Sequence, residues 1–544
     1  MSKSKQMDIK CMTWRNGILS LFFVSLILFL AFYGAGKSLW LDEAYSVLVA
    51  KQNFSEMLAS LRHDAHPPLY YLLLSTWTKL FGDGEIALRS LSGMFYAGGV
   101  FAVYFLGREI YEERIGLLAA FLYALSPLAT GTAHSVRMYA LLGFLSALST
   151  LLFAKVFLQD NQSRLIFWGC VVFNALGMFT QIWFSFLLAS QLFTYVVLFY
   201  PKNRVKFFAL QFFSYVPFAI SWTPILLVQL KNNATAWIGR PGLADIATVL
   251  LGFYGERIAI VFYLTITVLL FLSFNIWSKE QRSKTFESFK LYIRSTSTLI
   301  FVLIFAFSIL IPFLVGQFKP IFGQTRFTII ALPAFVLILA PLLYKFLNRT
   351  VLTVFCVCLL CLVSFAFVRF QNRTEPCSDR NVTARLNEKI EDGDVLIFTS
   401  SSRTATDYYL NRFNADKQFA EYTFPRELDQ HPGWRNVPKM LENREALETE
   451  AENLSAELRN LTAKQRRRIW LFYGFDVDVS DILKNRLDES FVQTRKIDAS
   501  CAGADNNKQS DTFYTEILLY QSSSDQILET RPADSTLFSA NEPR

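Results

Sequence analysis

Long apolar runs recur along the first two thirds of the chain, and they constrain its fold more than any other feature of the sequence. A helix that crosses a bilayer needs about 20 mostly apolar residues. Eleven runs approach or exceed this length, at about residues 17–36, 84–107, 115–133, 139–158, 165–180, 182–200, 207–229, 255–276, 297–317, 327–346 and 350–369. We therefore expect an α-helical polytopic membrane protein with about eleven transmembrane helices.

The composition narrows the class of protein further. Charged residues make up only 18% of the 544 residues, whereas an average soluble domain carries about 25%. The mean hydropathy of +0.30 argues against a disordered, collagen-like or nucleic-acid-binding chain, and against an ordinary soluble enzyme. The net charge of +8 combines an excess of 15 basic residues in 1–370 with an excess of seven acidic residues in 371–544. Two differently solvated parts therefore meet near residue 370.

The basic residues predict how the chain crosses the membrane. The apolar stretch Pro67–Phe81 has only about 15 residues and begins with two prolines, so it could span or lie at the surface. With this stretch at the surface, six short cytoplasmic segments hold 18 basic residues, including the cluster at 279–294. A twelfth span would move that cluster outside. We expect a multi-pass protein of the plasma (bacterial inner) membrane, with its N-terminus cytoplasmic.

The predicted domains are a transmembrane domain at 1–370, with an external loop at 37–83, and an extracytoplasmic domain at 371–544. The first apolar run lacks a small-residue cleavage site, so we do not expect a cleaved signal peptide. In the second domain, short apolar segments at 394–399, 468–473 and 513–520 predict strands, and 404–413 and 442–465 predict helices. This alternation predicts a soluble α/β domain with a disordered end of about 20 polar residues. Cys377 and Cys501 lie in this domain, and whether they pair stays open.

Two adjacent acids follow the first apolar run, at Asp42 and Glu43. Partial burial beside the membrane would raise the pKa of at least one such carboxyl group, so that it could take a proton from an acceptor. The alternative is that both acids stabilise the N-terminus of an interfacial helix. The turn His66-Pro67-Pro68 favours a functional loop, because two prolines fix its backbone.

Several arginines lie at or near the predicted external ends of spans. An arginine offers a planar fork for phosphate oxygens and keeps its charge near apolar surroundings. Arg326 precedes a proline inside its span, Arg137 lies in Ser135-Val-Arg-Met-Tyr139, and Arg89 lies about one turn inside its span. The alternative for each of them is snorkelling to lipid headgroups. This set predicts a site for one lipid-linked phosphate.

These residues resemble the GT-C superfamily of integral membrane glycosyltransferases, and above all its protein mannosyltransferase and aminoarabinose transferase branch, glycosyltransferase family 39. That branch carries an Asp-Glu pair in its first external loop, matched by Asp42 and Glu43, and then a Pro-containing juxtamembrane motif, matched by His66-Pro-Pro-Leu-Tyr70. The stretch 84–92 and the segment from Ser126-Pro127 to Tyr139 also look typical of bacterial members. The resemblance covers about residues 17–160, and 320–335 more loosely.

The resemblance implies an inverting transfer from a polyprenyl-phosphate sugar to a glycan, lipid or protein acceptor on the extracytoplasmic face. It makes Asp42 the catalytic base with support from Glu43, and requires no cofactor, nucleotide or metal. The candidate substrate-binding residues are His66, Tyr70, Arg89, Arg137, Tyr139 and Arg326. The aminoarabinose branch has a second Asp after the third span, where this chain reads Ser135–Tyr139 without an acid. This departure argues against a lipid A aminoarabinose transferase.

Two other classes of protein compete with a transferase. A transporter or flippase of polyprenyl-linked glycans would show inverted repeats and charges at the middle of the membrane. This sequence shows neither. A structural or sensory protein with an acidic tail would leave the clustering of Asp42, Glu43, His66 and Arg326 unexplained.

Overall fold

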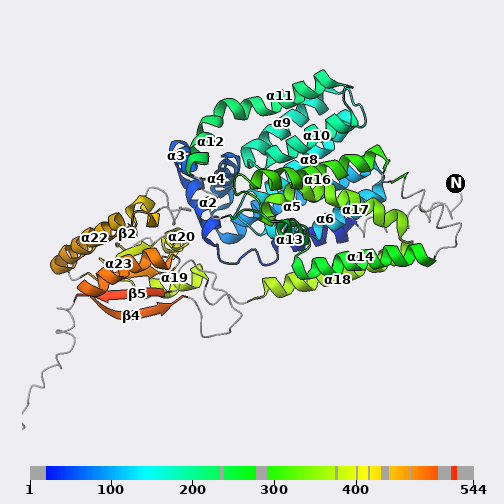
Figure 1. Ribbon diagram of the computed structural model, residues 1–544. Coiled ribbons are helices and arrows are strands. Elements are labelled where there is room, and N and C mark those ends of the chain that lie inside the picture. Colours follow the sequence, from blue (N-terminus) through cyan, green and yellow to red (C-terminus); the bar gives the residue numbers. More distant parts are fainter. Residues whose placement is uncertain are drawn as a thin grey trace, which may run out of the picture. The chain divides into compact units, whose positions relative to one another are not determined.

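The computed structural model describes residues 20–232, 238–276, 291–292, 294–373, 378–399, 402–413, 417–429, 440–465, 467–474, 476–499 and 516–522. The chain divides into two compact units (Figure 1). The first comprises Met1–Lys37 and Val49–Arg373, and the second comprises Ser38–Leu48 and Thr374–Arg544. The cluster at 279–294, except Arg294 and residues 291–292, lies outside the described residues, as do Cys377, Cys501 and the expected disordered end.

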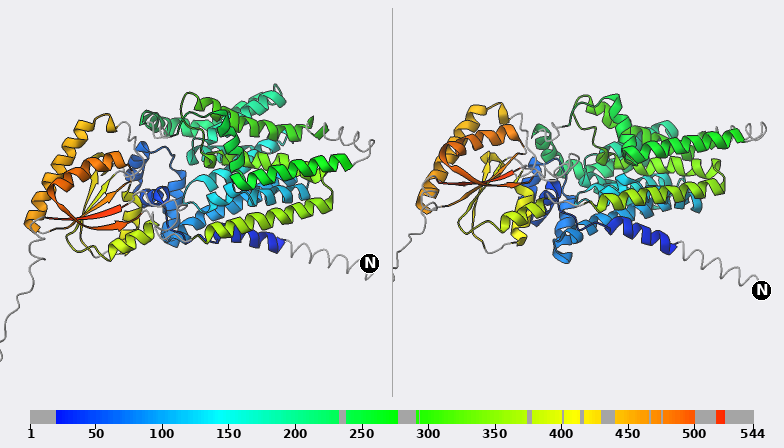
Figure 2. Two further views of the ribbon diagram at one scale, coloured as in Figure 1. Left: turned by 60° about the horizontal axis from the view of Figure 1, so that its bottom comes forward. Right: turned by 90° about the horizontal axis from the view of Figure 1, so that it is seen from below.

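Apolar helices build the first unit. Among the described residues, six stretches are long and apolar enough to cross a membrane: α5 (Glu85–Ile110), α8 (Tyr139–Phe157), α14 (Glu256–Ile276), α16 (Thr296–Gly316), η1 with α17 (Thr325–Ala331 and Leu332–Phe346) and α18 (Arg349–Gln371). Figure 2 shows them as a bundle, with α14 and α18 side by side. The chain is thus a multi-pass membrane protein.

Two further predicted spans are bent. Each is a single apolar run in the sequence but forms two helices in the structure. Between α6 (Glu113–Ala124) and α7 (Pro127–Ala133) the axis turns by 64°, and between α11 (Arg204–Ser221) and α12 (Thr223–Asn232) it turns by 65°. A proline stands beside each break, because Pro127 starts α7 and Pro224 is the second residue of α12. Counting each bent pair as one span gives eight spans within the described residues.

Shorter apolar helices stand at three of the remaining predicted spans. They are Ser20–Phe32, α9 (Arg164–Thr180) and α10 (Phe184–Leu198). A fourth, α13 (Leu243–Gly252), lies in a segment predicted to be a loop. The number eleven therefore stays a prediction. The predicted external loop contains three helices, α2 (Leu41–Lys51), α3 (Phe54–His63) and α4 (Leu69–Phe81). The helix α4, which covers the stretch considered as a twelfth span, has 13 residues, fewer than the about 20 that a span needs.

Glycines allow α5 and α6 to approach closely. A Cβ atom on Gly116 would lie 2.6 Å from the carbonyl oxygen of Tyr104 and 2.7 Å from the backbone nitrogen of Arg108. Gly107 faces it, and a Cβ there would lie 2.7 Å from the Cα of Gly116. Small residues at such crossings are typical of membrane helices, whose association depends on close packing.

A five-stranded mixed sheet forms the centre of the second unit. Its strand order is β2 (Ala420–Phe424), β1 (Val395–Thr399), β3 (Ile469–Tyr473), β5 (Glu516–Gln521), β4 (Val492–Asp498), with β2, β1 and β3 parallel and β5 and β4 antiparallel to their neighbours. The side chains of β1 alternate between two cores. Val395 and Ile397 pack with α22 (Arg444–Gln465) and α23 (Val477–Ser490). Leu396 and Phe398 pack with α19 (Asp379–Asn387) and α20 (Arg403–Phe413).

These two cores explain why the central strands read as continuous apolar runs. Helices cover both faces of the sheet (Figure 2), and a strand buried on both sides loses the alternation of polar and apolar residues. The strands predicted at 394–399, 468–473 and 513–520 and the helices predicted at 404–413 and 442–465 all have counterparts. The predicted α/β fold of this part is confirmed.

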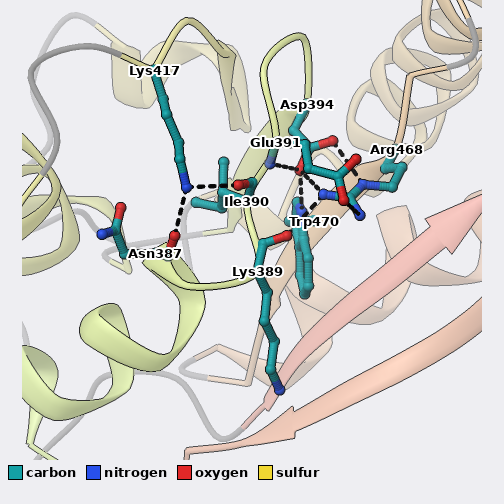
Figure 3. Close-up of polar contacts among 8 residues, drawn as sticks. All are labelled: Asn387, Lys389, Ile390, Glu391, Asp394, Lys417, Arg468 and Trp470. Carbon is teal, nitrogen blue, oxygen red and sulfur yellow. Dashed lines mark hydrogen bonds and ion pairs between the residues drawn. The ribbon is translucent and has the colours of Figure 1, made fainter.

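A buried carboxylate joins β1 to β3 (Figure 3). Asp394, 2% exposed, accepts hydrogen bonds from Arg468 Nε at 2.9 Å and Nη2 at 2.7 Å, and from Trp470 Nε1 at 2.8 Å. Arg468 Nη1 also reaches the more exposed Glu391 at 2.6 Å. A bidentate arginine–carboxylate pair fixes both partners geometrically. Arg468 therefore stabilises the sheet.

Candidate functional site

The two adjacent acids lie in the first turn of α2. The Trp40 amide donates to Glu43 Oε2 at 3.3 Å, and the Glu43 amide donates to the Trp40 carbonyl at 2.9 Å. This pairing gives the Trp40 amide at the start of the helix an acceptor. Glu43 is buried, whereas Asp42 is partly exposed. The helix-cap interpretation of the acidic pair therefore fits Glu43.

In the first unit, His66 and Arg137 contact each other although 71 residues separate them. Arg137 Nη2 lies 2.7 Å from His66 Nε2, and both side chains are buried, at 4% and 7% exposed. A guanidinium has only donors, so His66 accepts through Nε2 and carries its ring proton on Nδ1.

A chain of hydroxyl groups ties the proline turn to the segment that carries Arg137. Tyr70 Oη lies 3.4 Å from Ser92 Oγ, which in turn donates to the Ser135 carbonyl at 2.6 Å. From α12, Gln229 Nε2 donates to the Leu61 carbonyl of α3 at 2.8 Å and to the His66 carbonyl of the turn at 3.5 Å. Neither Ser92 nor Gln229 is among the candidate residues predicted from the sequence. A polar residue at the end of an apolar run was the signal that could have found Gln229.

Arg326 lies beside Tyr139, two residues beyond Arg137. Its guanidinium carbon is 5.5 Å from the centre of the Tyr139 ring and 5.6 Å from that of Phe327. Cation–π contacts of this kind hold an arginine in place without using its hydrogen-bond donors. η1, which carries Arg326, packs against α8, which begins at Tyr139. The first unit thus brings together His66, Tyr70, Arg137, Tyr139 and Arg326.

The side chain of Arg89 donates hydrogen bonds to backbone carbonyl groups. Its Nη1 donates to the carbonyls of Ala35 at 2.9 Å and Lys37 at 2.5 Å, and its Nε donates to the His134 carbonyl at 3.0 Å. The side chain is 4% exposed. This geometry favours a structural role over the predicted contact with substrate, because backbone carbonyls accept from both Nε and Nη1.

His134 also bonds to backbone, since its Nε2 lies 2.8 Å from the Leu30 carbonyl. Among the residues that the structure describes, no group of three or more His, Cys, Asp and Glu side chains could hold a metal ion.

The chain is similar to known proteins both in sequence and in fold. Residues 65–228 match the family model described as dolichyl-phosphate-mannose-protein mannosyltransferase. The crystal structure of ArnT from Cupriavidus metallidurans in the apo state is 12% identical, with a TM-score of 0.58 over 93% of this chain and 98% of that one. ArnT bound to undecaprenyl phosphate is 11% identical, with a TM-score of 0.59 over 92% and 98%. No curated protein sequence matches the chain.

The likeness to ArnT is one of fold, and it extends over nearly the whole of both chains. Together with the family match over residues 65–228, it makes the chain similar to membrane glycosyltransferases of the mannosyltransferase and aminoarabinose transferase branch, as its motifs predict.

Proposed function

We propose that this protein moves a sugar from a polyprenyl-phosphate donor to a glycan, lipid or protein acceptor on the extracytoplasmic face, with inversion at the anomeric carbon. An ArnT of the same fold has been solved with undecaprenyl phosphate bound, which supports a lipid phosphate as the donor's carrier. The single observation that carries the proposal is the meeting of His66 with Arg137 and of Tyr139 with Arg326 along one segment of the first unit.

The chemistry follows from the residue types. The acceptor oxygen attacks the anomeric carbon as the bond from that carbon to the phosphate oxygen breaks, and the departing lipid phosphate gains negative charge. Arg137 and Arg326 stabilise that charge, and oriented cations of this kind contribute most where water is excluded. His66 and Tyr139 hold the two guanidinium groups in orientation. Because the phosphate is already a good leaving group, the step uses no nucleotide.

Asp42 takes the proton that the acceptor loses. Glu43 supports it by fixing the first turn of α2, where its carboxylate accepts the Trp40 amide. A positioned general base contributes about 10²–10⁴-fold to the rate. Asp42→Asn keeps the size of the side chain and removes the basic oxygen.

The test measures sugar transfer by the purified full chain in detergent, with polyprenyl-phosphate sugars and candidate acceptors. We expect Asp42→Asn to lower kcat by about 10²-fold or more. The matched control is Asp83→Asn, which changes another acid of the predicted external loop, one that forms an exposed ion pair with Lys51. It should stay within about twofold of the wild type. Transfer by Asp42→Asn at the wild-type rate would refute the assignment of the base.

A further inference from the structure

The segment that carries Asp42 and Glu43 begins on a hydrogen-bonded anchor in the second unit. The Leu39 amide donates to the hydroxyl oxygen of Tyr409 at 2.7 Å, and Ser38 Oγ donates to the same oxygen at 3.2 Å. The Arg380 amide donates to Ser38 Oγ at 3.2 Å. The segment Ser38–Leu48 belongs to the same compact unit as Thr374–Arg544.

These contacts come from two different helices of the second unit. Arg380 lies in the first turn of α19, whose leading amides have no partner within the helix, so Ser38 supplies an acceptor for one of them. Tyr409 lies in α20. Its ring is 1% exposed and packs edge-on against Tyr408 at 4.8 Å and stacked on Phe413 at 5.9 Å. A ring packed on two sides holds its hydroxyl group in one place.

Leu39, whose amide bonds to Tyr409, directly precedes Trp40, whose carbonyl accepts the first hydrogen bonds of α2. The Trp40 carbonyl accepts from the Glu43 and Ala44 amides at 2.9 and 3.0 Å, and Ser46 Oγ donates to the Asp42 carbonyl at 2.9 Å. Within this short, bonded segment, fixing Leu39 fixes where the helix begins. It therefore fixes where the Asp42 carboxylate stands.

We propose that Tyr409 is a positioning residue for the acidic pair, and that it ties the second unit to the transfer reaction. This inference rests on the proposed function of Asp42. Tyr409 acts through the backbone of Leu39 and does not touch the reacting atoms. A displacement of about 1 Å at a reacting group can cost about 10²-fold in rate.

The experiment uses the full chain and two readouts. Tyr409→Phe keeps the ring and removes only the hydroxyl group, and Ser38→Ala is a second variant that removes the neighbouring hydroxyl. The matched control is Tyr422→Phe, which removes a tyrosine hydroxyl that donates to Glu457 at 3.2 Å in the same unit. Amide hydrogen exchange at Leu39, followed by mass spectrometry, reports the anchor directly and does not depend on activity.

In Tyr409→Phe we expect exchange at Leu39 to be faster by about tenfold, as the loss of one buried hydrogen bond of roughly 1.4 kcal/mol implies. We expect kcat to fall by about tenfold or more while the KM for the donor changes less than about twofold, since the donor's contacts stay in place. Ser38→Ala should change both quantities in the same direction, and Tyr422→Phe should change neither. Because a loss of folded protein also lowers the apparent kcat at an unchanged KM, kcat is calculated per folded protein, with the folded fraction of each variant measured by size-exclusion chromatography.

The outcomes separate the two proposals. Unchanged exchange at Leu39 in Tyr409→Phe would overturn the anchor. Faster exchange with an unchanged kcat, in an enzyme that Asp42→Asn inactivates, would overturn positioning and leave the proposed function standing. Full activity of Asp42→Asn would overturn the proposed function and the catalytic use of the anchor together, whatever the exchange at Leu39.

Discussion

Replacing Asp394 by alanine should destabilise the second unit far more than replacing Glu391, although both carboxylates bind the same guanidinium. Asp394 is 3% exposed in its side chain, and its loss leaves Arg468 Nε and Trp470 Nε1, both turned into the protein, without their acceptor. Removing one partner of a buried pair costs about 3–5 kcal/mol. Glu391 is 71% exposed, so its pair with Arg468 contributes at most about 1 kcal/mol.

The assay is thermal unfolding of the full chain in detergent, followed by near-ultraviolet circular dichroism, to which Trp470 contributes. For a folding unit of 150–250 residues, about 1 kcal/mol shifts Tm by about 2–4 °C. Asp394→Ala should therefore lower the Tm of the second unit by about 6–20 °C, and Glu391→Ala by about 4 °C or less. Equal shifts for the two variants would refute the reasoning that burial, and not the number of ion pairs, sets the contribution.

Two further predictions concern one group in each unit. Burial and the carboxylate of Glu421 raise the pKa of Asp407 to about 7, against the opposing effect of Arg403. Because this raised pKa favours the protonated form in the folded state, the Tm of the second unit should fall as pH rises from about 4 to about 7, and Asp407→Asn should flatten that dependence. In the first unit, Gly116→Ala places a Cβ against backbone and should cost about 1–3 kcal/mol. The control is Gly169→Ala, whose Cβ meets only Leu152 at 3.7 Å. In size-exclusion chromatography after heating, Gly116→Ala should aggregate at a lower temperature than the wild type, and Gly169→Ala should behave as the wild type does.

The sequence predicted those elements whose signal is local. The strands β1 and β3 are continuous apolar runs because helices cover both faces of the sheet. Strand β4 was missed because its residues, Val492–Asp498, are mostly polar and only Ile497 is fully buried. The bends between α6 and α7 and between α11 and α12 were missed because hydropathy reports composition and not direction.

The candidate site was predictable only in part for a related reason. Arg137 and Arg326 were found from their positions near the ends of apolar runs. The partners of Arg89 are carbonyl oxygens, which every residue carries, so no residue type in the sequence marks them. Tyr409 lies 370 residues from Leu39, and no pattern within either segment marks that contact.

The bend between α6 and α7 has a consequence for how the proposed lipid-phosphate donor would reach Arg137. α6 has 12 residues and α7 has seven, with a 64° turn between them. At about 1.5 Å per residue, an α6 standing along the bilayer normal rises about 18 Å, and α7 adds about 5 Å. The hydrocarbon layer is about 30 Å thick, so the turn after α7 ends about 7 Å below the far headgroups. If the proposed donor is a lipid-linked phosphate, we expect it to arrive there sideways from within the leaflet, along a route that a water-soluble phosphate does not have.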